Sequence, residues 1–113
     1  MAAHDRLQIR GVPRADGAEL RLSGELTLAT ASGLVDEVGR VERSAPALLV
    51  FDLRELRFID STGLALLIAA QQRGRRDGRR LVVVVGPGPV ERLFTLSGLE
   101  GQFETAPAPP TAT

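Results

Sequence analysis

The chain has 113 residues, a formal net charge of zero at pH 7, 43% hydrophobic residues and 25% charged residues, which is typical of one globular domain. A neutral chain argues against direct DNA binding through phosphate neutralisation. The sequence has no Cys, and its single histidine is His4, near the terminus, so it offers no disulfide, no thiolate nucleophile and no recognisable metal site. We therefore expect no catalytic residues, no metal, no cofactor and no enzymatic activity.

Targeting and membrane signals are also missing from the sequence. The N-terminal segment lacks the apolar run of a signal peptide. No apolar stretch reaches the roughly 18 residues that a membrane span needs. We therefore expect a cytoplasmic protein without a membrane span.

The first two strands are predicted to form a β-hairpin. Apolar residues at alternate positions mark these strands: Leu7, Ile9 and Val12, then Leu20 and Leu22. Glu19 and Arg21 alternate with the leucines, which predicts one solvent-facing side for the second strand. The pair Asp16 and Gly17 is typical of a tight turn.

An amphipathic helix is expected next. Thr27 is placed to cap it, because a threonine hydroxyl can accept a hydrogen bond from a backbone N–H two or three residues later. The pattern ends before Pro46. The apolar residues that recur at helical spacing behind Thr27 are Leu28, Ala31, Leu34, Val35, Val38 and Val41.

Two nearly continuous apolar segments, residues 47–53 and 81–85, predict buried strands. Between them a helix is expected to open at Asp60 and Ser61 and to run to about Arg76. Its inner face is predicted to carry Leu64, Leu67 and Ile68. The residues that widen its apolar surface, either for a partner or as simple helix formers, are Ala65, Leu66, Ala69 and Ala70.

The last part of the chain predicts a short helix and a short strand. Pro89 suits a first helical position, Gly98 suits a left-handed helix end, and Phe103 is expected on a final strand. Residues 106–113 are rich in Pro and Ala, with too little apolar surface to offset their ordering entropy. They are predicted to be a disordered tail, dispensable for binding, after a folded domain over residues 1–105.

The predicted elements follow the order β-β-α-β-α-β-α-β. Buried strands that alternate with helices indicate the α/β class. The expected architecture is a single domain with a mixed, mainly parallel β-sheet and helices packed on it.

The segment Asp60-Ser61-Thr62-Gly63 carries the most specific chemistry. A helix start offers unpaired N–H groups and the positive end of the helix dipole, so a phosphate on Ser61 would be electrostatically favoured. Gly63 removes a side chain beside the hydroxyls, which would let another protein's active site approach. Asp, Ser and Thr also start ordinary helices, so the motif alone leaves both interpretations open.

Three segments occur together in the chain: Ser23-Gly24-Glu25-Leu26, Asp60 to Leu64, and Arg92-Leu93-Phe94 with Leu96-Ser97-Gly98-Leu99. In this order and spacing they resemble the STAS domain of bacterial anti-sigma-factor antagonists, over about residues 7 to 105. The resemblance implies a STAS-like fold and a phosphoprotein that regulates transcription by partner switching. Such a protein binds an anti-sigma factor that is also an ATP-binding serine kinase, frees a sigma factor, and is reset by a phosphatase.

The resemblance also implies site residues. Ser61, the first hydroxyl of the motif, is the expected phosphate acceptor, with Thr62 as the alternative. Family members often carry Asp at the position of Thr27, so a charged contact is lost here, and a final helix common in the family is missing. The expected partner surface comprises Glu25, Thr27, Asp60, Ser61, Thr62, Gly63, Leu64 and Ala65.

Other interpretations stay open at this point. Within the same family, the chain could be an accessory subunit of a lipid-transport ATPase or a stressosome-type scaffold. The five arginines of residues 73–80 are either a patch for an acidic partner or a solvated helix end, where cations suit the dipole. The prolines of residues 86–89 remove N–H donors, which favours a plain turn over a nucleotide-binding loop.

Overall fold

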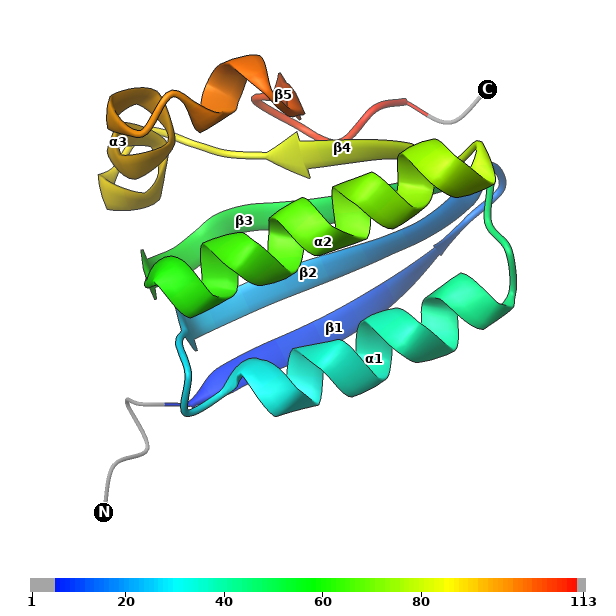
Figure 1. Ribbon diagram of the computed structural model, residues 1–113, viewed down its shortest axis with the longest axis horizontal. Coiled ribbons are helices and arrows are strands. Elements are labelled where there is room, and N and C mark those ends of the chain that lie inside the picture. Colours follow the sequence, from blue (N-terminus) through cyan, green and yellow to red (C-terminus); the bar gives the residue numbers. More distant parts are fainter. Residues whose placement is uncertain (1–5, 112–113) are drawn as a thin grey trace.

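The computed structural model of the chain describes residues 6–111. His4 and the last two residues of the predicted tail lie outside the described residues. Figure 1 shows the elements in their order along the chain. They are β1 (Leu7–Arg14), β2 (Gly17–Leu26), α1 (Ala31–Arg43), β3 (Leu48–Ile59), α2 (Ser61–Asp77), β4 (Arg80–Val84), α3 (Pro89–Leu96), a 3-10 turn (Leu99–Gly101) and β5 (Glu104–Ala106).

The strands form one mixed sheet in the order β1-β2-β3-β4-β5. β1 and β2 pair antiparallel, and the other neighbours pair parallel, which confirms the predicted topology. The hairpin turns through Ala15 and Asp16, one residue earlier than predicted, and Gly17 begins β2. A Cβ atom on Gly17 would lie 2.0 Å from the carbonyl oxygen of Leu48, so this close approach requires glycine.

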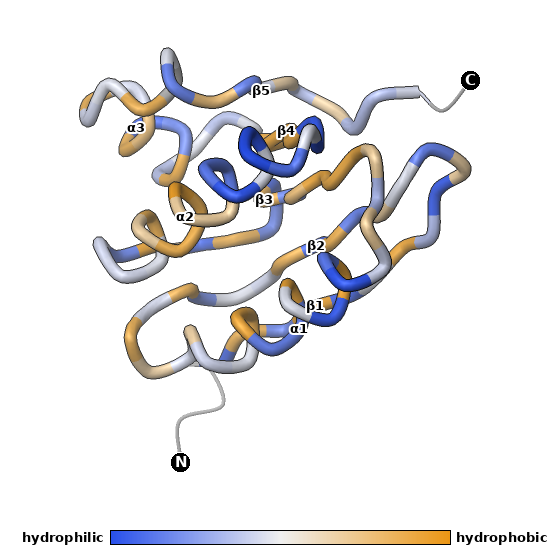
Figure 2. Tube along the Cα trace, turned by 45° about the vertical axis from the view of Figure 1, so that its right-hand side comes forward, coloured by the Kyte–Doolittle hydropathy of each residue, from blue (hydrophilic) through white to orange (hydrophobic). Residues whose placement is uncertain are grey.

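All three helices pack on one face of the sheet and enclose the main core with it (Figure 1). Figure 2 shows hydrophobic stretches along the central strands and at the start of α2. Ala70, which was predicted to widen an outer surface, is fully buried, so that part of the prediction is wrong. The helical residues in this core include Leu34, Val38, Leu67, Ala70, Val90 and Phe94.

The predicted inner face of the first helix is too wide. Leu28 is 77% exposed and Val35 is 55% exposed. The helix begins only at Ala31, so Leu28 precedes it. Val35 flanks the buried stripe of Leu34 and Val38, and a helix that rests on a sheet covers only one stripe of its surface.

The prediction that Glu19 faces solvent is also wrong, because its side chain is only 3% exposed. One carboxylate oxygen accepts a hydrogen bond from Arg14 Nη1 at 3.4 Å, and the other accepts from Arg21 Nε at 2.6 Å. A buried carboxylate requires such partners. The helix-free face of the sheet therefore carries charged side chains that are partly shielded from solvent.

The helix-free face also carries a second apolar cluster. Its strand residues are each at most 4% exposed although no helix covers them: Leu48, Val50, Val82 and Val84. Ala106 packs against this cluster. Beyond β5 the chain runs alongside β4 toward the hairpin end of the sheet (Figure 1), where Arg14 Nη2 donates to the carbonyl oxygen of Pro110 at 2.7 Å.

The prediction of a disordered tail is therefore wrong for residues 106–110. Ala106 ends β5 and pairs with Val84, and its carbonyl oxygen accepts from Val85 N at 3.1 Å. Backbone pairing and Arg14 supply the stabilisation that the side chains of this segment lack. Phe103 lies just before β5 and packs its ring on Phe94, with the ring centroids 5.8 Å apart.

The arginines of residues 73–80 are mostly paired within the domain, which favours the solvated helix end. Arg73 and Arg79 contact Glu42 at 3.0 and 3.2 Å. Arg80 forms an ion pair with Glu104. Gly78, at φ 74°, ends α2 in the left-handed conformation.

We expect truncation after Thr105 to lower the melting temperature by roughly 5 °C or more, because it removes Ala106 from the apolar cluster of Val82 and Val84 and breaks the Arg14–Pro110 hydrogen bond. Thermal unfolding followed by circular dichroism measures this. Truncation after Thr111 is the control and should leave the melting temperature unchanged. Equal stability of the two truncated chains would contradict a stabilising role for residues 106–110.

Candidate functional site

The site is built where β3 ends and α2 begins. Asp60 is the N-cap of α2 in an extended conformation (φ −101°, ψ −176°). Its backbone N–H donates to Leu26 of β2 at 3.1 Å, and its carbonyl oxygen accepts from Leu64 N at 3.0 Å. The backbone of Asp60 thus makes both a hydrogen bond to the end of β2 and the first hydrogen bond of α2.

The Asp60 carboxylate also joins two segments that are distant in sequence. Oδ1 accepts from Gly63 N at 3.0 Å, and Oδ2 accepts from Leu28 N at 3.1 Å. The hydrogen bond from Gly63, then those from Leu28 and Thr62, hold the pKa of the Asp60 carboxyl below its usual value, against the opposing effect of desolvation. The carboxylate is therefore ionised at neutral pH and links α2 to the loop before α1.

Ser61 is the first residue of α2 and is exposed, while Thr62 is partly buried. In this first turn of α2 the Gly63 N–H already donates to the Asp60 carboxylate. The Gly63 N–H is therefore not available to an incoming phosphate. An added phosphate would instead lie beside an ionised carboxylate.

Gly63 has a different role from the predicted one, because it is buried rather than at the surface. A Cβ atom at this position would lie 2.7 Å from Ile59 Cγ1 and 2.8 Å from Leu26 Cγ. Glycine is needed so that the first turn of α2 can sit directly on the strand ends. This position does not offer a contact surface to a partner.

Thr27 does not cap the first helix, which corrects the prediction. Its hydroxyl accepts from Ala29 N at 3.2 Å, and its backbone N–H donates to Thr30 Oγ1 at 3.0 Å. The Thr30 hydroxyl in turn donates to the carbonyl oxygen of Glu25 at 2.9 Å. The two threonines stabilise a turn at residues 27–30. This turn connects β2 to α1, which begins only at Ala31.

Glu25 lies at the end of β2, and its side chain is partly exposed. It pairs in register with Phe58 of β3. The preceding Gly24, at φ +97°, has no room for a side chain, because a Cβ atom would lie 2.2 Å from the carbonyl oxygen of Arg6. Gly24 therefore allows the backbone of β2 to pass close to Arg6, and Glu25 is the residue of this segment that a partner can contact.

The structure brings most of the predicted site residues to one end of the molecule. Glu25, Thr27, Ser61, Thr62 and Ala65 are exposed or partly exposed there. Leu64 is only partly exposed and packs against the main core.

Sequence reasoning missed two apolar residues next to Asp60. Leu28 is 77% exposed and its N–H is held by the Asp60 carboxylate. Phe58 is 51% exposed and stands two residues before Asp60. A phenylalanine followed by a core isoleucine in an alternating strand was the signal that could have placed Phe58 on the outside. Exposed apolar side chains beside a polar motif are typical of a protein-binding surface.

Within residues 6–111, no cluster of three or more His, Asp or Glu side chains is arranged to hold a metal ion. No helix in the same range is long and apolar enough to cross a membrane. What the site presents is the hydroxyls of Thr27, Ser61 and Thr62, two carboxylates and apolar side chains.

We expect Asp60→Asn to lower the melting temperature at pH 7, and Asp60→Ala to lower it further. The folded state holds the pKa of Asp60 below its unfolded value, so this stabilisation is present above about pH 4 and is lost as the pH falls further. Thermal unfolding between pH 7 and pH 3 should show the gap between wild type and Asp60→Asn closing. Asp36→Asn, an exposed change on α1, is the control, and a gap that stays constant with pH would contradict the assignment.

We expect Gly63→Ala to destabilise the domain by about 2 kcal/mol, because the new methyl group overlaps two core side chains. Gly33→Ala is the matched control, since that helical glycine has nothing within 4 Å of the added atom. Chemical denaturation measures both. A Gly63→Ala variant as stable as Gly33→Ala would show that the first turn of α2 can shift freely.

The comparisons with known proteins agree with this geometry. Residues 11–105 match the family model described as "Mlab, STAS domain". The anti-sigma-F factor antagonist RsfB of Mycobacterium tuberculosis is 31% identical over 103 residues, covering 91% of this chain and 84% of the relative.

Solved structures share the fold. A crystal structure of an anti-sigma factor antagonist from Mycobacterium paratuberculosis has a TM-score of 0.86 and 27% identity, covering 96% of this chain and 92% of that one. The unphosphorylated anti-sigma factor antagonist SpoIIAA has a TM-score of 0.68 and 20% identity, covering 91% of this chain and 89% of its own. The resemblance drawn from the three sequence segments is confirmed, and the chain belongs to the STAS-domain family.

Proposed function

We propose that this protein is an anti-sigma-factor antagonist that binds its partner through the α2 start and is switched off by phosphorylation of Ser61. The observation that carries the proposal is the exposed Ser61 on a rigid helix start, in a chain whose curated relative RsfB is named for that role. The partner is an anti-sigma factor with ATP-dependent serine kinase activity. A phosphatase restores the unphosphorylated form in the cytoplasm.

The exposed residues around Ser61 supply the two kinds of contact that a protein interface needs. Leu28 and Phe58 are apolar anchors, and a few such buried side chains carry most of the binding energy at an interface. Glu25 and Asp60 add negative charge, which guides the orientation of a partner. Thr27 contributes a neutral contact and fixes the turn that presents Leu28.

Phosphorylation acts on this surface by charge. A phosphoserine adds about −1.5 to −2 charges, here beside the ionised carboxylate of Asp60. Asp60 already occupies the Gly63 N–H, and Ser61 is exposed, so the new charge faces the partner. A partner that holds ATP brings phosphates of its own to this place, and misplaced like charges cost several kcal/mol at an interface.

We predict that Ser61→Asp loses partner affinity by roughly a hundredfold or more, while its melting temperature stays near that of wild type. Ser61→Ala should bind like wild type but become insensitive to ATP. Titration calorimetry with the anti-sigma factor, with and without ATP, measures both effects. Tight binding by Ser61→Asp would refute local repulsion as the switch.

Thr62→Ala is the matched control for the site of modification. Peptide mapping after incubation with kinase and ATP should find phosphate on Ser61 in wild type and in Thr62→Ala. If Ser61→Ala incorporated phosphate at the wild-type level, the acceptor would be Thr62 instead of Ser61.

A further experiment separates the other roles within the family. Affinity capture with the wild-type chain, followed by mass spectrometry, should recover an ATP-binding anti-sigma factor. Recovery of a lipid-transport ATPase subunit would make the chain an accessory subunit instead. Recovery of large assemblies of related STAS proteins would favour a stressosome-type scaffold.

A further inference from the structure

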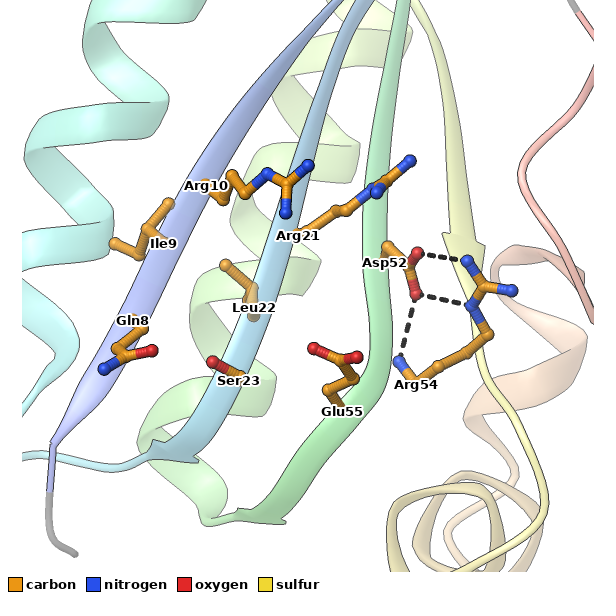
Figure 3. A pocket seen from close by; sticks show the side chains of 9 residues that line it. All are labelled: Gln8, Ile9, Arg10, Arg21, Leu22, Ser23, Asp52, Arg54 and Glu55. Carbon is orange, nitrogen blue, oxygen red and sulfur yellow. Dashed lines mark hydrogen bonds and ion pairs between the residues drawn. The ribbon is translucent and has the colours of Figure 1, made fainter.

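The helix-free face of the sheet carries polar side chains in rows that the pairing register defines. Arg10 of β1 lies opposite Arg21 of β2, which lies beside Asp52 of β3. The next row toward the α2 start joins Gln8, Ser23 and Glu55 in the same way. The two rows line a hollow of about 600 Å³ (Figure 3).

The row of Arg10 and Arg21 places two positive charges directly across an antiparallel pair, which is an unfavourable arrangement by itself. Figure 3 shows both side chains extending toward β3. Arg21 forms an ion pair with Glu19 at 2.6 Å. Arg10 forms no ion pair with any of the described residues 6–111.

The acidic groups nearest to this row already have arginine partners, whereas Glu55, in the next row, has no ion pair among residues 6–111. Glu19 is shared, because Arg14 also contacts it at 3.4 Å. The hairpin therefore holds three arginines on this face, Arg10, Arg14 and Arg21, against the two carboxylates of Asp16 and Glu19. Among these hairpin groups one positive charge is left over, and it belongs to Arg10. The carboxylate of Glu55 lines the same hollow one row away, opposite Ser23.

The carboxylate of Asp52 on the β3 side of the hollow is already occupied. It accepts from Arg54 Nε at 3.0 Å and from Arg54 Nη2 at 2.7 Å, and Figure 3 shows this paired arrangement. Arg54 N–H also donates to the same carboxylate at 3.1 Å. Asp52 is therefore not free to form a close pair with Arg10.

We propose that this hollow binds a small oxyanion-bearing ligand, with its phosphate or carboxylate group held between Arg10 and Arg21. Guanidinium groups bind both kinds of oxyanion through paired hydrogen bonds. The amide of Gln8 and the hydroxyl of Ser23 lie one row away and make no side-chain hydrogen bond within residues 6–111, so they can contact the body of the ligand. The site is distinct from Ser61 and does not depend on the proposed switch.

The test is a titration of the full chain with inorganic phosphate and, separately, with succinate, each against chloride at equal ionic strength. Backbone amide signals in two-dimensional NMR should shift saturably around residues 8–10 and 21–23. Comparing the dissociation constants of phosphate and succinate shows which of the two groups the site prefers.

Arg10→Gln should weaken the better ligand by roughly tenfold or more, because one charge-assisted hydrogen-bonding partner is lost. The variant should keep its fold, since Arg10 is exposed and unpaired. Arg43→Gln is the matched control: it removes the same charge from an exposed position on α1 and should leave the dissociation constant unchanged. Ser61→Ala should leave it unchanged as well, which separates this site from the switch.

Three results would overturn the proposal. The first is the absence of saturable shifts with either anion. The second is an equal loss of affinity in Arg10→Gln and Arg43→Gln, which would mean screening of the whole surface. The third is binding of similar strength around every exposed arginine, which would mean an adventitious ion only.

Discussion

The two oxygens of the Asp60 carboxylate hold the functional end of this protein together. One binds the first turn of α2 and the other binds the loop before α1, so two segments separated by more than thirty residues share a single acceptor. Ser61 and Leu28 consequently stand at fixed positions relative to one another. A partner meets a surface that is already ordered, and little conformational entropy is spent when it binds.

The two faces of the sheet shield their side chains from solvent in different ways. One face is covered by helices and holds a conventional apolar core. The other is divided. Its β3–β5 half is apolar, with Ala106 of β5 packed against it, while its β1–β2 half is charged and relies on shared ion pairs. Glu19 can be buried in this half only because two arginines reach it from neighbouring positions.

Sequence patterns were sufficient for features that depend on neighbours along the chain. Alternation and helical spacing placed the strands and helices in the right order, and the Asp-Ser start of α2 was found because N-caps have a local preference. Features that depend on distant segments were not accessible. Gly63 looked like an opening for a partner, but it is set by contact with Leu26 and Ile59. Thr27 looked like a helix cap, but Thr30 competes for the same turn.

The segment after β5 has a consequence for how the chain is made and handled. Proteins are synthesised from the N-terminus, so Val50 and Val82 leave the ribosome before Ala106, which packs against their cluster. Until Ala106 follows, the nascent domain presents an apolar sheet face to chaperones and to other chains. A purification tag inserted directly after Thr111 would add its bulk beside Pro110, where Arg14 binds the chain to the hairpin.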